Sequence, residues 1–178
     1  MRIIRVLFSL CLPVIVVGQF GIMKDGKLDK LQEAGVDADG KIDAKYESLA
    51  RDLQSVTPIA QEDALHIAIL IDAAKKDPET VSLVARMRSE EGDALKEMSK
   101  RSSAIEIVQG LKSGLEELKA IEILFTNPDR AVIEMEKEGL IDKKRIDFYK
   151  KNPDALADDT RKAVYFSFVS IAAAGGYL

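Results

Sequence analysis

Three aspartates near the N-terminus have the residue type and spacing that could bind a metal ion. Asp37, Asp39 and Asp43 surround Gly40 in the stretch Asp-Ala-Asp-Gly-Lys-Ile-Asp. Carboxylate oxygens are the ligands that calcium prefers, and a glycine permits the sharp bend that lets such ligands converge. Weak calcium binding through residues 37–43 is therefore one hypothesis for the function of this chain.

The same stretch resembles the centre of an EF-hand loop but lacks both of its ends. If Gly40 occupies the glycine position of such a loop, Gly35 and Tyr46 stand where the first and last acidic ligands belong. Glu47 follows one residue too late to supply the last ligand. We favour the alternative that residues 37–43 form a polar turn and cap the next helix, so we predict no metal site.

The only histidine does not lie in a recognisable catalytic or metal-binding pattern. Asp63 and His66 have the carboxylate-x-x-His spacing of di-iron helical bundles, but such a site needs two of these units and the chain has one. Zinc would find one imidazole, and the only thiol is Cys11. We expect His66 to be a core or helix-flank residue, and we predict a noncatalytic protein without a cofactor.

The composition favours helices that bury aliphatic side chains. Of the 178 residues, 47% are hydrophobic, only 6% are aromatic and none is tryptophan. A core of Ile, Leu, Val, Ala and Met suits packed helices better than a β-sandwich. The formal charge of −4 disfavours nucleic acid as a partner, because an acidic chain repels phosphates.

The first 18 residues have the pattern of a signal peptide. Arg2 and Arg5 precede an apolar stretch, and Val16 and Gly18 are small enough for a signal peptidase site. We expect the secretory pathway or secretion, with an uncleaved signal anchor as the alternative. Gly18-Gln19-Phe20 is also similar to precursors of secondary plastids, in which a phenylalanine follows the signal peptide, and this resemblance implies an organelle as a further alternative.

Three helix starts share one local pattern of an Asp or Asn, a proline and an acid. They are Asp77-Pro78-Glu79, Asn127-Pro128-Asp129 and Asn152-Pro153-Asp154. The first residue can cap free N–H groups, the proline has a preset φ, and the acid lies at the positive end of the helix dipole. Ser103 and Glu106 form a capping-box pattern that opens what we expect to be the longest helix.

Apolar residues at intervals of three and four predict further helices. We expect helices near residues 42–56, 60–76, 78–88, 94–100, 103–125, 128–138, 142–151 and 160–174. In three of these helices the pattern predicts the following buried side chains: Val81, Val84 and Met87; Leu95 and Met98; and Ile105, Val108, Leu111, Leu115, Leu118, Ile121 and Phe125.

These patterns predict an all-α protein. We expect a compact multi-helix bundle or a short helical array of about six to eight helices. After the signal peptide, we expect residues 19–41 to form a polar segment with a short helix and residues 42–178 to form a single α-helical domain.

The apolar residues 163–178 admit two interpretations. After a signal peptide and the polar residues 154–162, they resemble the tail of a lipid-anchored precursor, which implies membrane attachment. The interpretation that we favour is a helix packed against the long helix. Membrane association through an uncleaved N-terminus or through this C-terminus remains open.

The middle of the chain resembles the Asp-Pro-rich helical repeats of cochaperones. The Asx-Pro-acid starts and the scattered Met87, Met98 and Met135 carry this resemblance, which covers residues 77–159. It implies short helices around a methionine-lined groove that binds apolar peptide segments.

Taken together, these features predict a noncatalytic helical interaction or structural subunit that binds another protein. The alternative is a carrier that holds a lipid or other apolar ligand in a helical core. The apolar stretches 64–74 and 164–171 motivate that alternative.

We predict that the protein purified from the cells that make it begins at Gln19, because cleavage follows small residues at the signal peptidase site. Edman sequencing of the purified chain tests this prediction. A chain that still begins at Met1 would contradict cleavage and favour the signal anchor.

Overall fold

The computed structural model describes residues 43–90 and 92–178. This part of the chain contains eight α-helices and no β-strand, so the all-α prediction and the expected number of helices are confirmed. The helices are α3 (Ala44–Val56), α4 (Gln61–Lys76), α5 (Pro78–Glu90), α6 (Gly92–Arg101), α7 (Ala104–Leu124), α8 (Pro128–Lys137), α9 (Ile146–Lys151) and α10 (Pro153–Ala174). The signal peptide, the polar segment 19–41, Asp37 and Asp39 lie outside the described residues.

The three proline-marked helix starts are confirmed, and two of them are capped as predicted. The carboxylate of Asp77 accepts a hydrogen bond from the Thr80 backbone N–H at 2.9 Å. The side-chain oxygen of Asn127 accepts one from the Arg130 N–H at 3.2 Å. Each cap satisfies an N–H group that has no partner inside its own helix.

The predicted cap at Asn152 is wrong. Its side chain makes no capping hydrogen bond to α10, although the helix begins at Pro153. Instead, the side-chain amide donates to the carbonyl oxygen of Phe148 at 3.0 Å. Asn152 also ends α9, and its side-chain amide gives the Phe148 carbonyl a second hydrogen bond beside the one from the Asn152 backbone N–H.

The capping box at the start of α7 is present with both of its hydrogen bonds. The Ser103 hydroxyl accepts from the Glu106 N–H at 3.2 Å, and the Glu106 carboxylate accepts from the Ser103 N–H at 2.7 Å. The backbone and side-chain hydrogen bonds from Ser103 hold the pKa of Glu106 below its ordinary value. Local sequence therefore fixes this helix start.

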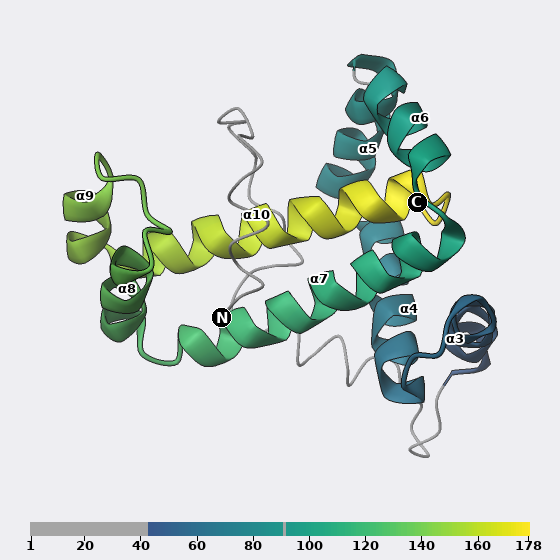
Figure 1. Cartoon of the computed structure of the whole chain (residues 1–178), viewed down its shortest axis with the longest axis horizontal. Helices are drawn as coiled ribbons and strands as arrows, with labels where there is room; N and C mark the ends of the chain where they lie inside the picture. Colours follow the sequence, from purple (N-terminus) through teal and green to yellow (C-terminus); the bar gives the residue numbers. More distant parts are fainter. Residues whose placement is uncertain (1–42, 91) are drawn as a thin grey trace.

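Two long antiparallel helices, α7 and α10, form the centre of the fold (Figure 1). Their 21 and 22 residues correspond to lengths of about 32 and 33 Å at 1.5 Å per residue. The expectation that the helix after Ser103 is the longest is wrong by one residue. The start at Asn152 and the apolar stretch to Ala174 belong to one uninterrupted helix.

Glycines allow α7 and α10 to approach closely. A Cβ atom on Gly110 would lie 3.2 Å from a side-chain carbon of Ile171, and one on Gly114 would lie 3.3 Å from the Phe168 ring. Both distances are shorter than ordinary van der Waals contacts. Larger residues at these two positions would push the helices apart.

The other helices pack around this pair. In Figure 1, α8 and α9 lie at one end of the pair, and α3 to α6 lie toward the other end. Buried apolar residues from seven of the eight described helices meet in one core, and α6 contributes the half-buried Leu95. A smaller apolar cluster joins α3 to α4 through Tyr46, Ala50, Ala64, Leu65, Ala68 and Ile69.

The apolar residues of α10 belong to the core. Tyr165, Phe168 and Val169 are fully buried, and the helix makes its most extensive contact with α7. This agrees with the favoured interpretation of residues 163–178 as a packed helix. Within residues 43–90 and 92–178, no helix combines the length and apolar character needed to cross a bilayer.

Three side chains that were predicted to be buried are exposed instead: Val81, Met98 and Ile105. In α5, Val84 and Met87 are buried as predicted, and Thr80 and Leu83 are buried where Val81 was expected. Thr80 can enter the interior because its hydroxyl lies 2.6 Å from the Asp77 carboxylate and 3.0 Å from the Tyr165 hydroxyl. A satisfied polar group therefore takes the place that periodicity assigned to Val81.

The methionines do not line a common groove. Met87 and Met135 are buried in the core, whereas Met98 is exposed on α6. The groove that the cochaperone resemblance implies is therefore not formed by these three residues.

We predict that Gly114→Leu destabilises the protein by about 2 kcal/mol, because the added side chain overlaps Phe168 across the central helix pair. Urea unfolding of the variant and the wild type measures this change. Ser113→Leu, at the adjacent exposed position, is the control and should change stability by less than about 0.5 kcal/mol. Equal effects of the two substitutions would contradict the close approach.

Candidate functional site

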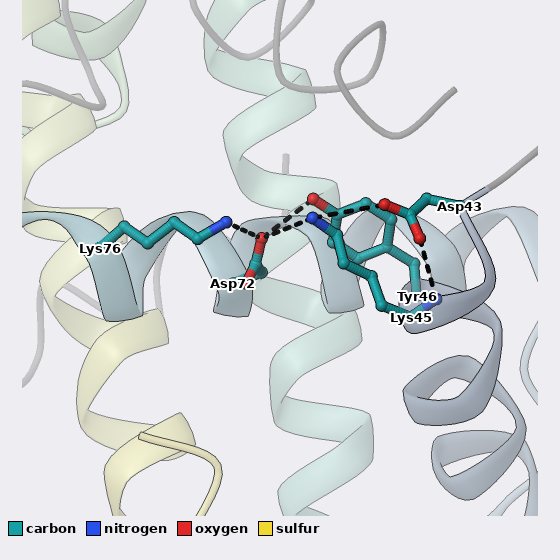
Figure 2. Close-up of polar contacts among 5 residues, drawn as sticks. All are labelled: Asp43, Lys45, Tyr46, Asp72 and Lys76. Carbon is teal, nitrogen blue, oxygen red and sulfur yellow. Dashed lines mark hydrogen bonds and ion pairs between the residues drawn. The ribbon is translucent and has the colours of Figure 1, made fainter. Parts of the chain in front are cut away.

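The most connected polar cluster lies where α3 packs on α4. Figure 2 shows that side chains of both helices contact the Asp72 carboxylate. Its Oδ2 accepts hydrogen bonds from the Tyr46 hydroxyl at 2.9 Å and from the Lys76 Nζ at 2.7 Å. The Lys45 Nζ lies 3.6 Å from the same oxygen and 4.4 Å from the centre of the Tyr46 ring.

The donors around Asp72 keep it ionised. Burial alone would raise the pKa of Asp72, but the hydrogen bonds from Lys76 and Tyr46 outweigh that effect, and the pKa lies below its ordinary value. The interaction with Tyr46, together with the charges of Asp72 and Asp43, raises the pKa of Lys45. All of these charges are matched within the cluster, so the arrangement is suited to joining two helices rather than to moving a proton.

Asp43, the one weak metal candidate that the structure describes, caps a helix. Its Oδ1 accepts from the Lys45 backbone N–H at 3.1 Å, and its Oδ2 lies 3.5 Å from the Lys45 Nζ (Figure 2). This is the alternative role predicted for residues 37–43. Across the described ranges 43–90 and 92–178, no group of three His, Cys, Asp or Glu side chains is arranged to hold a metal ion. Weak calcium binding through Asp37 and Asp39 stays the less favoured hypothesis, because both residues lie outside the described ranges.

His66 lies half-buried on the flank of α4. Near it, Asp63 forms an ion pair with Lys119 of α7 at 3.3 Å. Burial, and then the charge of Lys119, lower the pKa of His66 below its ordinary value. Its buried Nδ1 has no hydrogen-bond partner among the described residues. The imidazole is therefore a neutral group beside an interhelical ion pair at neutral pH.

A buried carboxyl group on α7 was not identified from the sequence. Glu117 is 8% exposed, and its Oε2 makes no hydrogen bond within the described residues. It lies on the face of α7 that also carries Gly114 and Ile121, between the contact of Gly114 with Phe168 and the ion pair of Glu122 with Arg161. Burial raises the pKa of Glu117 to about 7.

The feature of the sequence that indicates burial of Glu117 is its spacing from apolar-face residues of α7. Glu117 follows Gly114 by three residues and precedes Ile121 by four, which places it on the same helical face. Polar residues on an apolar face are normally read as the edge of that face. Tertiary packing, which the spacing does not indicate, buries the carboxyl group.

Ion pairs also join α10 to α7 and to the residue before α9. Arg161 of α10 binds the Glu122 carboxylate of α7 with an Nε–Oε1 distance of 2.7 Å. At the far end, the Asp159 carboxylate accepts from the Arg145 guanidinium at 2.9 Å and from the Tyr149 hydroxyl at 2.7 Å. Burial and the hydrogen bond to Asp159 raise the pKa of Tyr149 above its ordinary value.

Comparison of the chain with protein-family models, curated proteins and solved structures found no match. The functional interpretation therefore uses the residues and geometry described above. Most of these residues supply interhelical contacts with satisfied charges, whereas the His66 Nδ1 and the Glu117 Oε2 are buried without a hydrogen-bond partner among the described residues.

We predict that Glu117 makes stability depend on pH. Its pKa is raised from 4.5 to about 7 in the folded protein, so the folded state binds the proton more tightly than the unfolded chain. The free energy of unfolding should fall as the pH rises from about 4.5 to about 7, by about 2 to 3 kcal/mol, and then level off. Urea unfolding across this range measures the effect.

Two variants test the assignment of this pH dependence to Glu117. Glu117→Gln should flatten the dependence and be more stable than the wild type above pH 7, because it removes a buried charge. Glu116→Gln, at the adjacent exposed position, should keep the wild-type profile. A Glu117→Gln profile that follows the wild type would show that another group titrates.

Proposed function

We propose that this protein is a noncatalytic helical interaction subunit that binds another protein. The observation that carries the proposal is a group of three exposed large apolar side chains on three consecutive helices; Ile123, Ile133 and Phe148 are exposed toward the other end of the molecule. Val81 of α5, Met98 of α6 and Ile105 in the first turn of α7 are 51%, 38% and 47% exposed. These three helices follow one another in the chain and lie toward the same end of the central pair (Figure 1).

The construction of α6 supports an interaction surface at this end. The helix has no fully buried residue, and Leu95 is the side chain that packs against the core. Apolar side chains, methionine included, are common in the buried centres of protein interfaces. The apolar side of α6 is therefore only partly covered. Together with the exposed Val81 and Ile105, it suits contact with a second protein.

The contacts of the charged side chains also support a noncatalytic role. Asp72, Glu122 and Asp159 each bind cationic side chains, and each joins two helices through these contacts or through a tyrosine. Groups that are held in this way stabilise a rigid scaffold. The signal-peptide pattern of residues 1–18 supports delivery of this scaffold to the secretory pathway or to an organelle reached through it.

The carrier hypothesis has less support from the geometry. The apolar stretches that motivated it lie in α4 and α10, and their side chains contact those of other helices in the core. A ligand would have to enter between these packed helices. The interaction proposal uses side chains that are already exposed.

We expect the variant Val81→Gln, Met98→Gln, Ile105→Gln to lose the protein complexes that the wild type forms in its own compartment. Glutamine has a good helix propensity, and each exposed position should change stability by less than about 0.5 kcal/mol. Chemical crosslinking in cells, followed by size-exclusion chromatography with light scattering, measures the complexes.

The matched control replaces exposed residues at the opposite end, Ile123→Gln and Ile133→Gln, and should retain the complexes. A wild-type protein that remains monomeric in its compartment and forms no crosslinked complex would contradict the proposed function. Retention of every complex by both variants would contradict the assigned surface.

A further inference from the structure

The short helix α9 and the turn before it carry a concentration of positive charge. Five of the nine residues 143–151 are basic and one, Asp147, is acidic. The whole chain carries −4 and this stretch carries +4, so the remainder of the chain carries −8. The charge distribution is therefore strongly asymmetric, with the cations gathered at one short segment.

Three of these cations are available to a partner. Lys143, Lys144 and Lys151 are exposed and form no ion pair within the described part of the chain. Phe148 lies among them in the sequence and is 49% exposed. Phe148 and Lys151 are separated by three residues in α9, so they lie on the same side of the helix.

The remaining side chains of the stretch fix α9 to its neighbours. Tyr149 is buried, and its hydroxyl donates to Asp159 of α10 at 2.7 Å. Arg145 binds the same carboxylate, and the Lys150 Nζ lies 2.8 Å from the Glu136 Oε2 of α8. Phe148 and the free lysines are therefore displayed on a rigid support.

Nearby carboxylates reduce the positive charge without cancelling it. Asp142 precedes the stretch, and its Oδ1 accepts from the Lys144 backbone N–H at 3.0 Å. Asp147 is exposed on α9 beside Phe148. With both acids counted, residues 142–151 still carry three positive charges in excess.

We infer that this surface, formed by Lys143, Lys144, Phe148 and Lys151, docks the protein on an anionic phospholipid bilayer. Basic side chains around an exposed aromatic ring are the combination that binds a lipid interface, because the cations attract the headgroups and the ring enters the apolar boundary. An acidic protein segment would match the charge equally well. The bilayer is favoured because it accommodates a single half-exposed ring, which packs edge-on against Tyr149, without a complementary cavity.

The shape and charge of the molecule agree with docking by this end. In Figure 1, α9 lies at one extremity of the long axis. An anionic surface attracts this extremity and repels the acidic remainder of the chain. The surface lies at the opposite end from Val81, Met98 and Ile105, so its failure would leave the proposed function standing.

Flotation of the protein purified from the cells that make it, together with vesicles, tests the inference. The wild type should bind vesicles of phosphatidylcholine with about 30 mol% phosphatidylserine, and should bind phosphatidylcholine alone much more weakly. The variant Lys143→Ser, Lys144→Ser, Lys151→Ser should lower the partition coefficient roughly 100-fold, since each cation near such a surface contributes about fivefold. Phe148→Ser should lower it about fivefold through lost apolar burial.

The control variant Lys75→Ser, Arg86→Ser, Lys96→Ser removes the same number of exposed, unpaired cations elsewhere on the described part of the chain. It should bind the anionic vesicles like the wild type. If an apolar segment elsewhere bound the vesicles, the partition coefficient would be the same in the wild type and in the variant that lacks Lys143, Lys144 and Lys151. Equal losses in the two triple variants, or no binding of the wild type, would overturn the inference. Binding of poly-glutamate in place of vesicles would overturn it in favour of an acidic protein partner.

Discussion

The close contact between α7 and α10 is the interaction on which the rest of the structure depends. Gly110 and Gly114 remove side chains where Ile171 and Phe168 of the other helix need space. Where the two helices lie close together, a continuous apolar surface forms along them, and α4, α5, α8 and α9 bury their apolar residues against it. The ion pair between Glu122 and Arg161 fixes the alignment of the two helices near the end of α7.

The polar residues of α10 find hydrogen-bond partners near this contact, whereas Glu117 of α7 does not within the described residues. Along α10, the hydroxyls of Thr160, Ser167 and Ser170 each donate to the carbonyl oxygen four residues earlier. Such hydroxyls can be buried because their hydrogen bonds are satisfied within their own helix. The Glu117 side chain is too long, and its carboxylate too strongly charged, to be satisfied in this way within its own helix. Burial of the carboxyl group therefore raises its pKa.

The two ends of the molecule have different surface chemistry because the central pair is long. One end presents Val81, Met98 and Ile105 from helices that are only partly covered, and the other presents Phe148 among lysines. The ionisable groups between these ends join helices to one another, as Asp63 and Lys119 do for α4 and α7. A rigid body with chemically distinct ends is suited to connecting two different surfaces, and this is consistent with a noncatalytic role.

The sequence by itself determined the helical class and most of the helix starts, because these depend on neighbours within one turn. Pro78, Pro128 and Pro153 each begin a helix, and Ser103 and Glu106 form a capping box. Asp43 caps α3, as the favoured interpretation of residues 37–43 predicted. Tertiary structure alone decided the exposure of Val81 on α5, the exposure of Met98 and Ile105, and the burial of Glu117. Periodicity gives the spacing of an apolar face, but burial depends on which helix covers that face and how near it comes. Here that distance is set by two glycines that meet large side chains more than fifty residues away in the sequence.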